Sequence, residues 1–337
     1  MRRMGVPAWT VISRVRGGNT DPTAVLTRPA PPPDVTLRYG PGSDHVADLR
    51  LPRPESAREV SPPAPLVIFL HGGFWRARYD RVHTWPLGAA LASAGFAVCT
   101  PEFRRVGQPG GGWPGTFDDV AAAVDALPDL ACQAAGPGRL APRPLVLAGH
   151  SAGGHLALWT AARHRLPDDC RWRTPSPGPY GGVVGLAAVS DLAGCHAAGL
   201  GGGAADALIG GGPGRYPDRY ALADPAGLLP LGVRVRLVHG SLDEVVPSAM
   251  SREYAERAVG RGDDVTVDEL TECGHYEPID PLTAAWPAVL SALRAIATPP
   301  GSGFQLPALA CMLSCLAPLA QSAERLHGKE KVYGSIP

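Results

Sequence analysis

Short apolar runs alternate along this chain with longer stretches of helical pattern. The apolar runs, four to seven residues each, lie at 66–70, 96–99, 145–148, 183–189 and 233–238. Strands that are buried on both faces give nearly continuous runs of this kind. Helix-compatible stretches lie between and after them, at 82–94, 117–130, 152–163, 248–259 and 281–297. Such alternation predicts an α/β fold, with a mostly parallel sheet and helices on both of its faces.

Two segments depart from this alternation. Ahead of it, residues 35–39 and 45–51 alternate apolar and polar side chains, which predicts an antiparallel hairpin. Further on, the stretch from Gly194 to Pro230 contains GLGGGAAD and GGGPGR and carries no strand signal. We expect a small, mobile, lid-like insertion over about 192–230, at the carboxyl edge of the sheet.

Proline-rich segments indicate where the domain begins and ends. RPAPPPD spans 28–34, and TPPGSG begins at Thr298. The chain of 337 residues is long enough for one large α/β domain with a substantial core. We therefore expect a disordered leader over 1–34, one domain over 35–299, and a disordered tail over 300–337.

Composition and charge exclude several classes of protein. Hydrophobic residues make up 45% and charged residues 18%, which is typical of a packed globular protein. The 31 basic and 31 acidic residues cancel, so no broad positive field is available to hold nucleic acid or anionic lipid. The seven cysteines include no CxxC pair, so neither a disulfide framework nor a zinc cluster is expected.

Nothing in the chain predicts attachment to a membrane. The basic start MRR is not followed by the long apolar stretch of a signal peptide, so we expect a cytoplasmic protein. The longest apolar run, at 304–320, is marginal in length for a bilayer span and contains Pro307 and Pro318. The oligomeric state is left open by the sequence.

A serine lies in a turn of small residues. The segment 149–153, GHSAG, follows a predicted strand directly and opens a predicted helix, which is the context of a nucleophile elbow. A serine in so sharp a turn needs small neighbours, because the strained backbone leaves no room for flanking Cβ atoms. Gly149 and Gly153 meet this need. The sequence thus predicts Ser151 as a nucleophile, with the amides of the following helix directed at a developing oxyanion.

A second turn of small residues follows another predicted strand. The segment 71–75, HGGFW, comes directly after the apolar run 66–70. Backbone N–H groups in such a turn can bind the oxygen of a substrate carbonyl. We expect Gly73 or Phe74, together with Ala152, to form this oxyanion hole.

Aromatic residues near these turns are candidates for substrate contact. Phe74, Trp75, Trp113 and Tyr276 can form an apolar wall that favours small uncharged acyl or aryl groups. The alternative is that all four are core residues, and the sequence does not decide between the two.

A serine nucleophile needs a base, and ten histidines compete for that role. Most of them lie in predicted turns, on the helix after the serine, or at the end of a strand. His275 instead lies in the loop CGHYEP, between the alternating segment 265–270 and the last predicted helix. We therefore expect His275 to be the general base.

The carboxylate that orients the base is expected after a neighbouring strand. The segment 239–247, HGSLDEVVP, follows the apolar run that ends at 238. Asp243 is our prediction, and Glu244 and Asp191 are the alternatives. The order Ser, Asp, His along the chain is the one expected when the nucleophile lies in such an elbow.

With these motifs, the sequence resembles the α/β-hydrolase superfamily, and within it the HGGxW group of esterases, lipase-like enzymes and kynurenine formamidase. The resemblance covers about residues 35–297. HGGFW, GHSAGG, HGSLDEVVP and GHYEPIDP are similar to the oxyanion, nucleophile, acid and base motifs of that group. The resemblance implies a mostly parallel sheet of about eight strands whose first strands form a hairpin.

These residues predict a serine hydrolase that cleaves small esters through an acyl-enzyme, with no metal and no organic cofactor. Its partner is a small ester or amide substrate. Two related activities stay open: an arylformamidase acting on N-formylkynurenine and a peptidase similar to prolyl oligopeptidases. A non-catalytic ligand-binding protein on the same scaffold is the alternative from another class.

Overall fold

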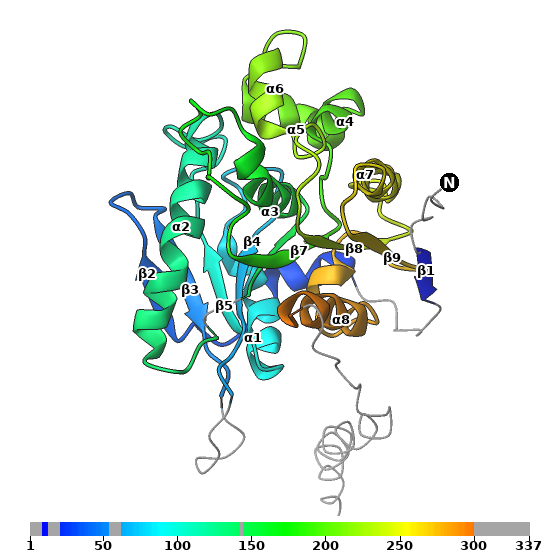
Figure 1. Ribbon diagram of the computed structural model, residues 1–337. Helices are drawn as coiled ribbons and strands as arrows, with labels where there is room; N and C mark the ends of the chain where they lie inside the picture. Colours follow the sequence, from blue (N-terminus) through cyan, green and yellow to red (C-terminus); the bar gives the residue numbers. More distant parts are fainter. Residues whose placement is uncertain (1–8, 13–20, 54–61, 142–143, 300–337) are drawn as a thin grey trace, which may run out of the picture. The chain divides into compact units, whose positions relative to one another are not determined.

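The computed structural model describes residues 9–12, 21–53, 62–141 and 144–299. Within them, nine strands form one sheet in the order β1-β9-β8-β7-β6-β4-β5-β3-β2 (Figure 1). The strands are β1 Trp9–Ile12, β2 Val35–Arg38, β3 Val46–Arg50, β4 Leu66–Leu70, β5 Ala97–Pro101, β6 Leu145–His150, β7 Tyr180–Leu186, β8 Arg234–Gly240 and β9 Val265–Leu270. The pairings from β1 through β5 are parallel, and β3 and β2 add an antiparallel edge.

Helices cover both faces of the sheet (Figure 1). The α-helices are α1 Trp85–Ser93, α2 Gly115–Ala135, α3 Ala152–Ala162, α4 Leu192–Ala197, α5 Leu200–Ile209, α6 Pro217–Ala223, α7 Ala249–Val259 and α8 Trp286–Ala297. Short 3₁₀ helices are η1 Pro22–Thr27, η2 Arg81–Thr84, η3 Arg163–Arg165 and η4 Glu277–Ile279. Helices α1 and α8 pack on one face, and α2, α3 and α7 on the other. None of the helices in the described ranges is long and apolar enough to cross a membrane.

The alternation of side chains along the central strands builds two separate cores. In β4, Leu66, Ile68 and Leu70 pack toward α2 and α3, whereas Val67 and Phe69 pack toward α1 and α8. Each fully buried side chain of this type contributes roughly 1.5–3 kcal/mol to stability. The sheet is therefore a rigid platform, and the loops at the carboxyl ends of its strands hold the residues of the candidate site.

The predicted elements agree closely with the structure. Each apolar run coincides with one of the strands β4 to β8, and the alternating segment before His275 is β9. The predicted hairpin is present as β2 and β3, with Val35 opposite Leu49. The predicted helix at 82–94 is divided, because a 3₁₀ turn capped by the Asp80 carboxylate precedes α1.

The prediction of a disordered leader over 1–34 is wrong for part of that segment. Trp9–Ile12 is the strand β1, which pairs with β9 at one edge of the sheet. In η1, Val25 is buried against the side chains of the α1 face. Arg28 then forms a two-pronged ion pair with Asp280. Arg50 also donates to the carbonyls of Pro31 and Pro32. Contacts with distant residues therefore dock this segment, although its local sequence carries no periodic pattern.

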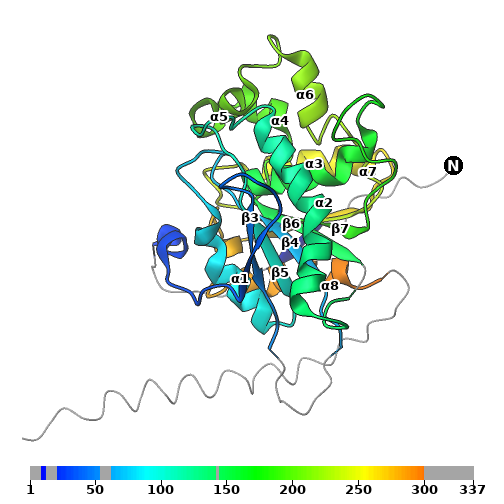
Figure 2. The ribbon, with the colours of Figure 1, turned by 90° about the vertical axis from the view of Figure 1, so that its left-hand side faces the viewer.

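The segment predicted as a lid forms the helices α4, α5 and α6, which both views place beyond α3 at one end of the domain (Figures 1 and 2). Three successive glycines, 201–203, adopt left-handed backbone conformations with φ of 57°, 63° and 77°. Only glycine accepts such a run without strain. A Cβ at Gly201 would lie 2.8 Å from Cγ of Phe74, so the insertion packs directly onto the HGGFW turn. The tail predicted over 300–337 lies outside the described residues.

Candidate active site

Ser151 occupies a strained turn between β6 and α3. Its φ of 55° and ψ of −119° lie outside the regions that non-glycine residues favour, which costs on the order of 1–3 kcal/mol. The flanking glycines are required by space: a Cβ on Gly149 would lie 2.2 Å from the carbonyl oxygen of Gly153, and one on Gly153 would lie 2.0 Å from that of Leu70. The turn has the geometry that the sequence predicts, and it directs the Ser151 side chain away from the regular path of the backbone.

The predicted base and acid are in contact. Nδ1 of His275, in the loop after β9, donates to Oδ2 of Asp243, in the loop after β8, over 2.7 Å. Both residues are buried, with exposed fractions of 6% and 8%. Since the carboxylate can only accept, Nδ1 carries the proton and the neutral ring presents Nε2 as its basic nitrogen.

The Asp243 carboxylate accepts four hydrogen bonds. Besides the bond from His275, Oδ2 accepts from Nε2 of His239 over 3.1 Å, and Oδ1 accepts from the backbone N–H groups of Val245 and Val246, each over 2.8 Å. Burial alone would raise the pKa of Asp243, but these donors and the nearby imidazole outweigh burial and hold it well below its ordinary value. Asp243 is therefore an ionised, fixed partner for the base.

The two alternative acids are not partners of His275. Glu244 is exposed to solvent. Asp191 caps the first turn of α4 by accepting from the N–H of Gly194, and it also pairs with Arg257. Asp243 is thus the one of the three predicted carboxylates that the structure brings to the base.

His239 is a functional neighbour that the sequence analysis missed. Its side chain is fully buried, and its Nδ1 lies 2.8 Å from the hydroxyl of Ser251 in α7. The other ring nitrogen faces both Asp243 and the carbonyl oxygen of Val246. Its position in HGSLDEVVP, four residues before the acid, is the only sequence signal, and a histidine that ends a buried strand does not by itself indicate such a role.

The loops that carry Ser151 and His275, the predicted nucleophile and base, are in contact. Nε2 of His150, the residue before Ser151, donates to the carbonyl oxygen of His275 over 2.9 Å, and the two imidazole rings are 4.7 Å apart between centroids. Within the described ranges neither Oγ of Ser151 nor Nε2 of His275 makes a hydrogen bond. Catalytic hydrogen bonds of this kind are often long without substrate and tighten when the substrate binds.

The HGGFW turn passes directly against the nucleophile. A Cβ at Gly72 would lie 3.2 Å from Cβ of Ser151. Gly73, Phe74 and Trp75 follow with positive φ angles of 109°, 50° and 55°. In the part of the chain that the structure describes, the N–H groups of Gly73, Phe74 and Ala152 donate to no protein acceptor, so they are available to a substrate oxygen.

A buried ion-pair network anchors the start of this turn. The ring nitrogens of His71 lie 2.9 Å from Oε1 of Glu102 and 2.9 Å from the carbonyl oxygen of Gly72, and Arg105 adds an ion pair to Glu102 at 3.1 Å. Burial opposes ionisation of Glu102, but His71 and Arg105 outweigh it and lower its pKa to about 2. Glu102 and Arg105 are therefore held in ion pairs behind the turn.

The four predicted substrate-contacting aromatics lie in different surroundings. Trp75 is 1% exposed and packs against the ring of His155 at 5.2 Å, so it is a core residue and its predicted role in substrate binding is wrong. Tyr276 is partly buried, with its ring 5.1 Å from that of His275. Phe74 lies between the turn and the glycines of the insertion.

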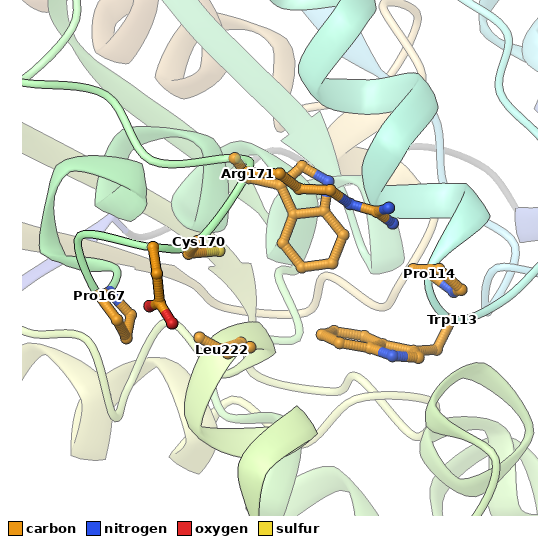
Figure 3. A pocket seen from close by; sticks show the side chains of 8 residues that line it. Trp113, Pro114, Pro167, Cys170, Arg171 and Leu222 are labelled. Carbon is orange, nitrogen blue, oxygen red and sulfur yellow. The ribbon is translucent and has the colours of Figure 1, made fainter.

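Trp113, the fourth of these aromatic residues, lines a separate hollow of about 390 Å³ (Figure 3). The other residues around it are Pro114, Pro167, Asp169, Cys170, Arg171, Trp172 and Leu222. The carbonyl of Leu222 accepts from Nε1 of Trp159, which lies about 12 Å along α3 from Ser151. The hollow is therefore not the place where a bond to Ser151 would form, and no predicted catalytic residue lines it.

No group of three or more His, Cys, Asp or Glu side chains is placed to hold a metal ion in the described ranges. The five cysteines that the structure describes are free thiols. The catalytic candidates in these ranges are Ser151, His275 and Asp243, with the N–H groups of the two turns.

Comparison with known proteins places this geometry in a family. The chain is 28% identical over 153 residues to a probable isoprenylcysteine alpha-carbonyl methylesterase of Oryza sativa subsp. japonica, a match of 44% of this chain and 34% of that protein. The chain thus spans about a third of the length of this curated relative.

Solved structures share the fold. A truncated carbohydrate esterase from gut microbiota matches with a TM-score of 0.62 and 21% identity, over 78% of this chain and 95% of that one. A thermophilic esterase of the Planctomycetes species Thermogutta terrifontis matches with a TM-score of 0.59 and 17% identity, over 82% and 99%. The predicted α/β-hydrolase fold is confirmed, with β1 as a ninth strand. The BD-FAE family model matches residues 50–257, more than half of the sequence, and the chain belongs to the BD-FAE family.

Proposed function

We propose that this protein is a serine hydrolase that cleaves small esters through an acyl-enzyme. The observation that carries the proposal is the strained Ser151 turn beside a His275 imidazole that is hydrogen-bonded to a buried, ionised Asp243. Oγ of Ser151 attacks the ester carbonyl carbon while Nε2 of His275 takes the hydroxyl proton. The imidazolium then gives that proton to the departing alcohol, and the carbon–oxygen bond to the alcohol breaks.

Deacylation repeats the same steps with water. His275 removes a proton from water, the hydroxide attacks the acyl carbon, and the proton returns to Oγ of Ser151 as the acid leaves. In both halves, negative charge on the substrate oxygen is stabilised by the N–H groups of Gly73 or Phe74 and of Ala152. Loss of one such donor reduces turnover by about 10²–10³.

The relatives support an ester as the substrate. The names of the curated relative and of the solved structures describe a methylesterase, a carbohydrate esterase and an esterase. The Thermogutta terrifontis esterase 2 has also been obtained phosphorylated by paraoxon, an organophosphate. We extend this to the present chain by proposing that such reagents modify Ser151.

Replacement of Ser151 by Ala tests the proposal. We expect kcat for p-nitrophenyl acetate to fall by roughly 10⁴–10⁶, and labelling by a fluorophosphonate probe to disappear, while the thermal unfolding midpoint changes little. Ser241→Ala is the control, because Ser241 is exposed in the loop that also carries Asp243. Equal labelling of Ser151→Ala and wild type would exclude Ser151 as the nucleophile. N-formylkynurenine, assayed in parallel, separates an esterase from an arylformamidase.

A further inference from the structure

His150 lies where three loops of the candidate site meet. It precedes Ser151 in the nucleophile turn and is 2% exposed. Its Nε2 is bonded to the backbone of His275, and its Nδ1 would lie 2.8 Å from a Cβ at Gly72. One side chain therefore contacts the turn that carries the nucleophile, the turn that binds the oxyanion and the loop that carries the base.

The contacts define which ring nitrogen of His150 carries the proton. A carbonyl oxygen only accepts, so Nε2 carries hydrogen and donates to His275 over 2.9 Å. Nδ1 is buried and has no hydrogen-bond partner among the described residues. Burial, and then the proximity of the His275 imidazole, lower the pKa of His150 well below its ordinary value. The ring is thus a neutral, permanent donor to the base loop.

The hydrogen bond supplies a second point of attachment for His275. Asp243 holds the imidazole of His275 from the side of β8, through Nδ1. The N–H of Leu242 also donates to the carbonyl of Cys273, so these two bonds tie the base loop to the acid loop and neither ties it to the nucleophile turn. His150 holds the carbonyl oxygen of His275 itself, and it is covalently linked to Ser151. The separation of Oγ and Nε2 is then constrained from the nucleophile side as well as from the acid side.

We propose that His150 is a positioning residue, which sets the separation of the nucleophile and the base by tying the His275 loop to the Ser151 turn. The proposal rests on the serine hydrolase function proposed above. The sharp turn of GHSAG does not itself need an imidazole at its second residue. The proposal gives the His150 side chain a role that the shape of the turn does not explain.

Substitution of His150 by Gln or Asn distinguishes the effect of its hydrogen bond from the effect of its packing. In glutamine the amide nitrogen is four bonds from Cα, as Nε2 is in histidine, so His150→Gln can still donate to the carbonyl of His275. In asparagine the amide nitrogen is one bond closer, so His150→Asn keeps an amide but does not reach. His150→Leu keeps much of the volume and removes the donor.

The kinetic test compares these variants with p-nitrophenyl acetate. We expect kcat to fall about 10²-fold in His150→Asn and His150→Leu, since a misplacement of about 1 Å costs this much, and to recover to within about fivefold of wild type in His150→Gln. KM should change little, because His150 is 2% exposed and offers a substrate almost no surface. Equal kcat values in the Gln, Asn and Leu variants would overturn the proposal.

His155, in the helix α3 that follows Ser151, provides a matched control. It is fully buried, and its Nε2 also donates to a backbone carbonyl, that of Ala223, over 2.9 Å. His155→Asn should therefore lower the unfolding midpoint about as much as His150→Asn, with a much smaller loss of kcat. If the two variants lose kcat equally, the effect of His150 is structural and the proposal fails.

A second measurement does not depend on catalysis. Amide hydrogen exchange in the segment 271–280, followed by mass spectrometry, should be faster in His150→Asn and His150→Leu than in His150→Gln and wild type. Unchanged exchange in all variants that fold would overturn the proposal. If wild type hydrolyses no ester while exchange changes as expected, the proposed function fails and the inference about loop attachment stands.

Discussion

Replacing Asp243 by Asn changes one charge and one acceptor at the centre of the candidate site. Four donors converge on the carboxylate: ring nitrogens of His275 and His239 at Oδ2, and the N–H groups of Val245 and Val246 at Oδ1. An asparagine offers one oxygen and one NH₂ group. In either orientation, two of the four donors therefore face another donor.

The two orientations have different costs. If the NH₂ group faces the histidines, His275 must present a bare Nδ1, so Nε2 carries the hydrogen and cannot accept the proton of Ser151. The equivalent change in a serine protease lowers kcat by about 10⁴, or about 5 kcal/mol of transition-state stabilisation. If the NH₂ group faces the backbone, two buried N–H groups lose their acceptor, at about 1–3 kcal/mol each. A histidine can change tautomer and a backbone N–H cannot, so we expect the first orientation.

The assay measures kcat for p-nitrophenyl acetate and the unfolding midpoint of Asp243→Asn. We expect a loss of kcat near 10⁴ with a drop in unfolding free energy of about 1–3 kcal/mol, from the weakened bonds to the histidines. Glu244→Gln is the matched control, because it removes the neighbouring, exposed carboxylate. A folded Asp243→Asn variant with kcat within tenfold of wild type would refute the role of Asp243.

Two further predictions concern the HGGFW turn. Gly73→Ala should lower kcat at least about 10²-fold by displacing the turn, since the new Cβ would lie 2.5 Å from Cβ of Tyr79. Gly95→Ala is the control and should leave kcat unchanged, because Gly95 also has a positive φ but is surrounded by open space. Equal losses of kcat in the two variants would contradict the reasoning. Glu102 has a pKa of about 2, below its unfolded value of about 4.5, so its stabilisation is present above pH 4.5 and is lost as the pH falls toward 2. Urea unfolding of wild type should weaken over this range by about 3 kcal/mol more than that of Glu102→Gln, and parallel pH profiles would disprove this.

The local sequence was sufficient to predict the buried strands β4 to β8 and the two turns. A strand buried on both faces must be apolar throughout, so 66–70 and 145–148 are recognisable without any partner. The glycines of GHSAG and HGGFW are equally local signals, because the backbone beside a strained residue excludes Cβ atoms. The order of these elements then predicts that the loops carrying Ser151, Asp243 and His275 lie at one edge of the sheet.

Contacts between distant segments could not be predicted in this way. The strand Trp9–Ile12 is recognisable only beside β9, and Val25 is a core residue only because the α1 face accepts it. Trp75 is as compatible with a binding wall as with a core until its burial in the folded protein is known. The roles of His150 and His239 likewise cannot be recognised without their hydrogen-bond partners, His275 and Asp243, which the loops bring into reach. Backbone sterics and strand burial depend on a few neighbouring residues, so the local sequence indicates them. A side-chain hydrogen bond between distant residues depends on where folding brings two segments together, so the local sequence does not indicate it.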